Sequence, residues 1–122
     1  MYVTVLEFHR ESEADAWRLA WTSQHADDRV RVIDRRAHES TGYSDIHAFV
    51  VLETETRPSV EPHWGTYAVA GPGYAYKVVA NSLHRALVAW QIWAFRCALD
   101  RLTVNDIVSV TSIALENKGG VT

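Results

Sequence analysis

Apolar and polar positions divide the chain into short and long blocks. The short blocks are rich in β-branched and aromatic residues and predict strands at residues 2–8, 30–34, 46–53, 66–70, 74–79 and 107–115. Two longer blocks repeat apolar residues at helical spacing and predict helices over residues 13–24 and from 83 to about 102. In the first of these, Trp17 and Trp21 are four residues apart and share one helix face with Ala14.

Cap and turn residues punctuate these blocks. Ser12 precedes Asp15 by three residues, which predicts an N-cap at Ser12, and the second helix has a cap candidate at Asn81 or Ser82. Residues 71–73 read Gly-Pro-Gly and predict a hairpin with a three-residue turn. The polar segment 37–44 predicts a turn that joins the second and third strands as a hairpin, and residues 54–65 predict a loop.

The predicted order of elements is β-α-β-β-(β-β)-α-β. Without the central hairpin this is the ferredoxin-like split β-α-β order. We therefore expect one α+β domain over residues 1–116, with an antiparallel or mixed sheet of four to six strands and both helices on one face. Residues 117–122 are expected to form a frayed C-terminal tail.

Composition agrees with a soluble globule. The 122 residues are 48% hydrophobic and 22% charged, and the net charge is -3. Cys97 is the single cysteine, so the chain forms no intramolecular disulfide. The N-terminus lacks the pattern of a signal peptide, and charged residues interrupt the most apolar stretch, residues 83–102. The expected location is the cytoplasm.

Two polar clusters suggest chemistry, and each has a plainer interpretation. The first contains two histidines and two acids that could bind a metal ion or act as an acid–base pair: His38, Glu39, Ser40, Asp45 and His47. Their spacing fits no common zinc motif and no nucleophile accompanies them, so a polar turn is preferred and we expect neither metal nor cofactor.

The second cluster is an arginine ridge formed by Arg29, Arg31, Arg35 and Arg36. Such a ridge could contact phosphates, which makes nucleic-acid binding an alternative function. Neighbouring aspartates reduce its field, and the sequence pI of about 6.0 is not that of a nucleic-acid-binding domain. A solvated, salt-bridged strand face is therefore preferred.

An aromatic segment is the strongest candidate for a binding site. The residues assigned to it are His63, Trp64, Tyr67, Tyr74, Tyr76 and Lys77. Rings with polar tips suit a small-molecule pocket or a protein interface. The alternative is that these rings cover one face of the sheet, where aromatic residues are common.

The second helix carries more apolar surface than one sheet face requires. The stripe Val88, Ile92, Phe95 and Leu99 would remain exposed if the other apolar side of this helix packs on the sheet. We therefore expect a homodimer with this stripe in its interface. The competing explanation is that the loop 54–65 or the following hairpin covers the stripe within one chain.

These observations favour a small protein-interaction module that binds itself or another protein, without a catalytic constellation. The alternative is a small-molecule binder or a small acid–base enzyme with an aromatic pocket that uses His47 or His63. Nucleic-acid binding through the arginine ridge is the second alternative. No membrane association is expected.

Overall fold

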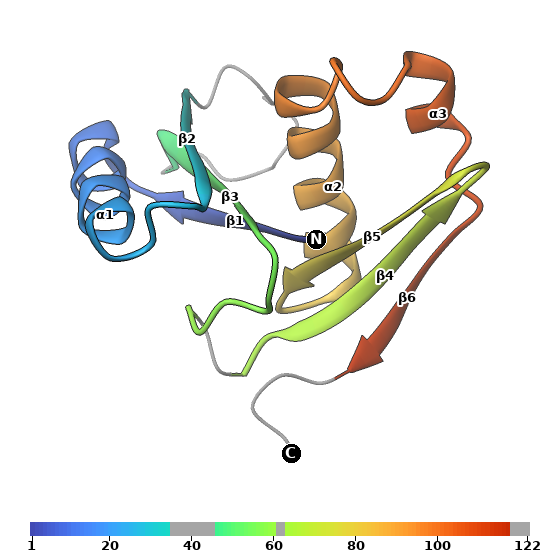
Figure 1. Ribbon diagram of the computed structural model, residues 1–122, viewed down its shortest axis with the longest axis horizontal. Helices are drawn as coiled ribbons and strands as arrows, with labels where there is room; N and C mark the ends of the chain where they lie inside the picture. Colours follow the sequence, from blue (N-terminus) through green and yellow to red (C-terminus); the bar gives the residue numbers. More distant parts are fainter. Residues whose placement is uncertain (35–45, 61–62, 118–122) are drawn as a thin grey trace.

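The computed structural model describes residues 1–34, 46–60 and 63–117. Within these ranges the chain forms six strands and three helices (Figure 1). In chain order they are β1 (Tyr2–Phe8), α1 (Glu11–Gln24), β2 (Arg29–Asp34), β3 (Ala48–Thr54), β4 (Gly65–Gly71), β5 (Tyr74–Ala80), α2 (Leu83–Cys97), α3 (Val104–Val108) and β6 (Ser112–Asn117). The α+β class is confirmed, with one mixed sheet in the order β2-β3-β1-β5-β4-β6.

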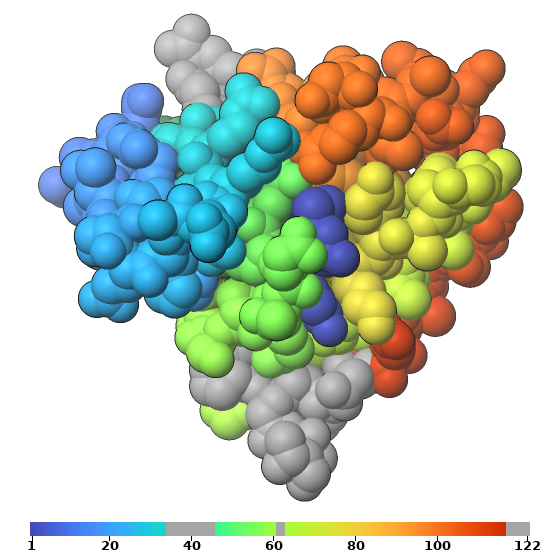
Figure 2. All heavy atoms as spheres, viewed as in Figure 1, coloured from blue at the N-terminus to red at the C-terminus, as the bar shows by residue number. Residues whose placement is uncertain are grey.

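The sheet consists of two similar halves that meet at a parallel pair. β1 and β5 run parallel, whereas all other neighbouring strands are antiparallel. β1, α1 and β2 therefore form a β-α-β unit with β3 inserted between its strands, and β5, α2 and β6 form a second unit around β4. Figure 2 shows the dark blue N-terminal strand between green β3 and yellow β5.

The two long helices cover opposite faces of the sheet. Leu6 packs in one cluster with Ala14 of α1, whereas the adjacent Val5 packs in the other cluster with Trp90 of α2. Successive strand residues face opposite sides, so α1 and α2 lie on opposite faces. The expected ferredoxin-like order with both helices on one face is therefore not confirmed.

The handedness of the two β-α-β connections explains why the helices lie on opposite faces and not on one. The first β-α-β unit moves from β1 toward one edge of the sheet, and the second moves from β5 toward the other edge. Right-handed crossovers in opposite directions place their helices on opposite faces. In the predicted order, the hairpin of β4 and β5 is an insertion into the sheet. In the structure, β5 is a central strand paired with β1.

The hairpin of β4 and β5 closes with a tighter turn than predicted. Gly71 pairs with Tyr74, which leaves the two residues Pro72 and Gly73 as the loop. Gly73 has a φ of 80°, which a type II turn with proline before glycine requires. Gly71 lies directly against the Tyr74 ring, because a Cβ built on it would come within 2.3 Å of that ring.

The helix boundaries partly match the prediction. α1 begins at Glu11 after an extended Arg10 that makes no side-chain cap, so the predicted cap at Ser12 is wrong. α2 is capped as predicted, since the Ser82 hydroxyl accepts a hydrogen bond from the Arg85 backbone N–H. It ends at Cys97 rather than near residue 102.

The C-terminal region contains a helix that the prediction missed. Thr103 and Asp106 form a capping box, in which each side chain accepts a hydrogen bond from the other residue's backbone N–H. This box starts α3 over part of the predicted strand 107–115, and β6 begins only at Ser112. The predicted turn 37–44 and most of the predicted tail lie outside the described residues.

The main core lies between the sheet and α2. Trp90 and Trp93 are almost fully buried there, and their ring centroids are 5.1 Å apart. Tyr74 and Tyr76 of β5 cover this pair, each with its ring centroid 5.7 Å from that of Trp90. Among the described residues, no helix is long and apolar enough to cross a membrane. The cytoplasmic location remains a prediction.

Candidate functional site

The sheet forks between its two central strands. β1 pairs with β5 only from Tyr2 to Thr4. Beyond this point β5 ends at Ala80 and leads into α2, while β1 continues to Phe8 and leads into α1 on the opposite face. In open sheets, ligands bind beyond the carboxyl ends of parallel strands at the place where their connections diverge to opposite faces. The topology therefore points to this fork.

A cleft of about 550 Å³ occupies the fork. This volume lies within the range of small-ligand pockets, which is roughly 300–1,000 Å³. Both central strands, both long helices and the segment before β4 contribute to it. Its lining residues are Val5, Leu6, Glu7, Phe8, Trp17, Trp21, Ser59, Val60, Trp64, Ala80, Asn81, Arg85, Val88, Ala89 and Ile92.

One wall of the cleft is an aromatic column on α1. The Trp17 ring lies 6.5 Å from that of Phe8 and stacks on Trp21 at 5.1 Å, and Trp21 stacks on His25 at 3.9 Å. The indole N–H of Trp21 donates to the Asp28 carboxylate at 2.9 Å. These contacts hold the rings in place, so the wall is formed without a ligand.

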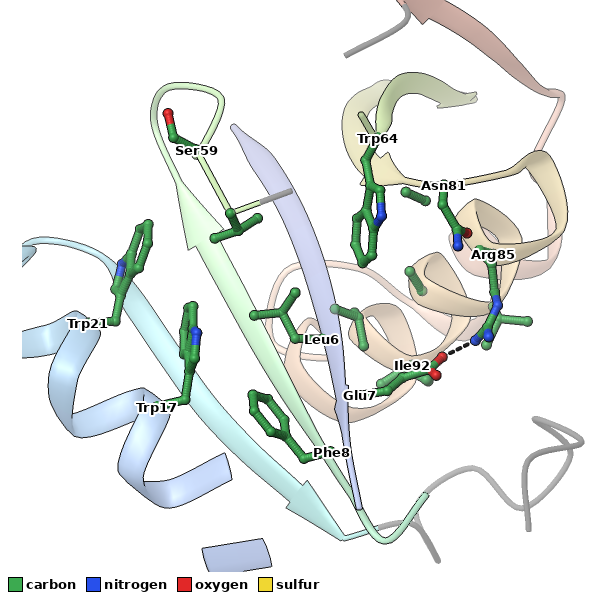
Figure 3. A pocket seen from close by; sticks show the side chains of 15 residues that line it. Leu6, Glu7, Phe8, Trp17, Trp21, Ser59, Trp64, Asn81, Arg85 and Ile92 are labelled. Carbon is green, nitrogen blue, oxygen red and sulfur yellow. Dashed lines mark hydrogen bonds and ion pairs between the residues drawn. The ribbon is translucent and has the colours of Figure 1, made fainter. Parts of the chain in front are cut away.

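Trp64 forms a second aromatic wall. Figure 3 shows the rings of Trp17 and Trp64 on either side of Leu6, and both pack against the cluster that contains Leu6. The Arg57 guanidinium donates to the Trp64 backbone carbonyl and, at 3.0 Å, to the Thr66 hydroxyl. Arg57 thereby anchors the segment that carries Trp64.

The two charged residues that line the cleft form an ion pair, beside the uncharged polar residues Ser59 and Asn81. Glu7 of β1 accepts a hydrogen bond from Arg85 of α2 (dashed in Figure 3), and both side chains are about three-quarters buried. Burial lowers the pKa of Arg85 from its ordinary value, yet a guanidinium remains charged at neutral pH. Because the two charges compensate, the cleft suits a ligand without a strong net charge.

The structure separates Trp64 from the three tyrosines of the predicted aromatic site. Trp64 is half-buried in the cleft, and His63 beside it is exposed. Tyr67 is buried in the main core, where Tyr74 and Tyr76 also pack. These three tyrosines therefore correspond to the plainer interpretation, in which rings cover the sheet face beneath α2.

Two polar groups of the hairpin have partners within the chain. The Tyr74 hydroxyl donates to the Asp106 backbone carbonyl at 2.7 Å, and burial raises the pKa of Tyr74. Lys77 forms an ion pair with Glu116 at 2.9 Å and lies 5.9 Å from the ring of Tyr2. The hydrogen bond with Glu116 is the main cause of the raised pKa of Lys77.

The predicted interface stripe is also divided by the fold. Ile92 is 1% exposed and faces the core and the cleft, so it is not available to a partner chain. Val88 is half-buried and lines the cleft. Phe95 and Leu99 remain exposed, at 40% and 54%. The apolar surface of α2 that the sheet and the cleft cover together is therefore wider than one stripe of residues.

The two polar clusters are described only in part. His38, Glu39, Ser40 and Asp45, together with Arg35 and Arg36, lie outside the described residues. His47 is exposed. Arg29 and Arg31 are exposed on β2, and Arg31 donates to the Arg96 backbone carbonyl at 3.1 Å. The expectations of no metal site and no strong nucleic-acid binding stay predictions.

Sequence reasoning missed most of the cleft. The spacing of Trp17 and Trp21 predicts that they share a helix face, but it does not predict that they line a cleft. Glu7 and Arg85 carry no motif, because they are 78 positions apart in the sequence. Their meeting depends on the parallel pairing of β1 with β5, and the only sequence signal is that both lie near the carboxyl ends of predicted strands.

Comparisons with protein-family models, with curated proteins and with solved structures give no match.

Proposed function

We propose that this protein is a ligand-binding protein whose site is the cleft at the fork of the sheet. One observation carries the proposal: the cleft lies where two adjacent parallel strands send their helices to opposite faces. That position favours ligand sites for a topological reason, since the diverging connections leave a crevice between them. The volume of the cleft and its half-buried rings are those of a binding site.

The lining favours an apolar or aromatic ligand that carries neutral polar groups. Trp17 and Trp64 provide flat apolar surfaces on the two sides of Leu6. Binding is favoured over catalysis because the carboxylate of Glu7 is already engaged by Arg85. This proposal follows the small-molecule alternative from the sequence, with Trp64 as the residue shared by both sites.

A fluorescent apolar probe without a charge, N-phenyl-1-naphthylamine, tests the site. The wild type is expected to bind it with increased probe fluorescence. Val88→Trp, on the half-buried side of α2, fills the cleft and is expected to weaken binding at least about tenfold. Leu87→Trp adds the same ring at the adjacent position, which lies outside the cleft lining, and should bind as the wild type does. Equal binding by both variants would contradict the proposed site.

A second candidate function is self-association, favoured by one specific observation. Exposed leucine and phenylalanine side chains follow one another at spacings of four and eight along α2 and the turn after it: Leu83, Leu87, Phe95 and Leu99. This exposed row differs from the stripe expected from sequence, because Val88 and Ile92 face the cleft. A homodimer through this row would bury it twice.

Matched leucine variants test self-association. Leu99 and Leu115 are 54% and 55% exposed, but only Leu99 belongs to the exposed row. If the protein dimerises through the row, Leu99→Glu should give a folded monomer in light scattering and Leu115→Glu should leave the dimer intact. A wild type that is monomeric at tens of micromolar would contradict this candidate.

A further inference from the structure

The cleft exposes the backbone edge of a strand. On the side that faces β5, the pairing stops at Thr4, so the Val5 carbonyl and residues 6–8 of β1 have no strand partner among the described residues. On its other side β1 pairs with β3 along its whole length. The residues of this open edge all line the cleft.

The hydrogen bonds of β1 indicate which groups point into the cleft. The Phe8 carbonyl accepts a hydrogen bond from the His47 backbone N–H at 3.0 Å, on the β3 side. The backbone groups of successive strand residues point to alternate neighbours. The N–H and C=O groups of Val5 and Glu7 therefore point toward the β5 side. The bridge between Thr4 and Val79 uses the Val5 N–H, so the groups that point into the open cleft are the Val5 C=O and the N–H and C=O of Glu7.

Such groups need a partner. Val5 is only 8% exposed, and backbone groups at buried positions are nearly always paired with backbone, side chain or water. An open strand edge is a template on which another extended chain forms main-chain hydrogen bonds. A ligand therefore binds this cleft most tightly if it offers hydrogen-bond donors and acceptors at the spacing of a strand.

We propose that the cleft binds an extended peptide segment, which adds as a strand beside residues 5–8 of β1. The peptide takes the place in the sheet that β5 leaves when it ends at Ala80. Residues 5–8 span about 13 Å at the rise of a strand. This inference rests on the proposed function and names the ligand class of the same site.

The surroundings favour an isolated strand over a second copy of the sheet. β5 already occupies the first part of the same edge, and it turns there into α2. Trp64 and Arg85 flank the open part as cleft-lining residues. The edge of an intact sheet would meet these elements, whereas a single extended segment fits between them.

The two faces of the cleft predict the side chains of the peptide. Residues beside Leu6 and Phe8 face the aromatic wall of Trp17, which favours aromatic and leucine side chains. Residues beside Glu7 face Arg85, which favours small or hydrogen-bonding side chains. The preferred sequence therefore alternates apolar and polar residues.

Matched peptides test the main-chain pairing. The probe is acetyl-Thr-Phe-Thr-Leu-Thr-amide, unmodified or N-methylated at either of two sets of backbone nitrogens: those of the second and fourth residues, or those of the third and fifth. A strand presents only one of these sets to β1, so the two methylated peptides have equal bulk but different hydrogen-bonding edges. Binding is followed by the backbone amide resonances of Val5 and Glu7.

We expect the unmodified peptide to shift both amides, and one methylated peptide to bind at least about tenfold more weakly than the other. Equal affinity of all three peptides would overturn the proposed pairing. The absence of shifts at Val5 and Glu7 up to about 1 mM peptide, the range of weak complexes, would overturn it too. In either case, N-phenyl-1-naphthylamine binding that Val88→Trp blocks would leave the proposed function standing. If neither the peptide nor this probe binds, both the peptide proposal and the proposed function are overturned.

Discussion

Arg101 donates hydrogen bonds to both carboxylate oxygens of Glu53, at 2.8 and 3.1 Å. The Glu53 side chain is only 6% exposed, whereas that of Arg101 is 29% exposed and lies 5.5 Å from the Trp93 ring. The hydrogen bond with Glu53 is the main cause of the raised pKa of Arg101. This ion pair joins the end of β3 to the turn that follows α2.

Removal of one partner should therefore be costly. Arg101→Met leaves the Glu53 carboxylate buried without its cation, and we expect a loss of about 2–4 kcal/mol in the free energy of unfolding. The double variant Glu53→Gln with Arg101→Met should recover much of this loss, because no unpaired charge remains. Urea unfolding of the variants measures both effects, and additive losses would contradict the coupling.

Thr4 offers a stabilising substitution. Its side chain is fully buried, and its hydroxyl has no hydrogen-bond partner among residues 1–34, 46–60 and 63–117. Thr4→Val keeps the shape and removes the unsatisfied group, so it should raise the free energy of unfolding by about 1 kcal/mol. Thr66→Val is the matched control, because the buried Thr66 hydroxyl accepts a hydrogen bond from Arg57. That variant should destabilise the protein, and the same sign for both would refute the explanation.

The contact of Gly71 with Tyr74 predicts a strong local effect. A Cβ at residue 71 would overlap the Tyr74 ring, which is held by stacking on Trp90 and by its hydrogen bond to Asp106. Gly71→Ala should therefore cost about 1–3 kcal/mol in thermal or urea unfolding. In a Tyr74→Leu background the same change should cost less than half as much. An unchanged cost there would show that the ring is not the obstacle.

Cys97 gives stability a pH dependence. Burial raises the pKa of its thiol, so the folded state holds this proton more tightly than the unfolded chain does. The stability that this protonated thiol contributes is fully present below the pKa of the unfolded thiol. It is lost as the pH rises through the pKa of the folded thiol. As the pH rises above about 8, wild-type stability should therefore fall more steeply than that of Cys97→Ala. Parallel pH profiles of the two proteins would contradict this.

Most elements follow from local patterns in the sequence. The first strand matches the prediction at both ends, and the helix after Ser82 begins where its cap was expected, because alternation and capping act over a few residues. The α+β class follows from the same signals. The predicted end of the second helix near residue 102 does not reveal that another helix follows. The capping box of Thr103 and Asp106 starts that helix, α3.

The cleft depends on long-range strand pairing, which local sequence patterns do not specify. Whether the hairpin of β4 and β5 lies at an edge or beside β1 depends on long-range pairing, and this choice places α1 and α2 on opposite faces. The same pairing stops at Thr4 and opens the fork. The sequence by itself determined which residues are apolar, aromatic or charged. Only the tertiary structure decided that Trp64 meets the end of β1 while Tyr67 enters the core, because packing, and not residue type, sets which rings remain accessible.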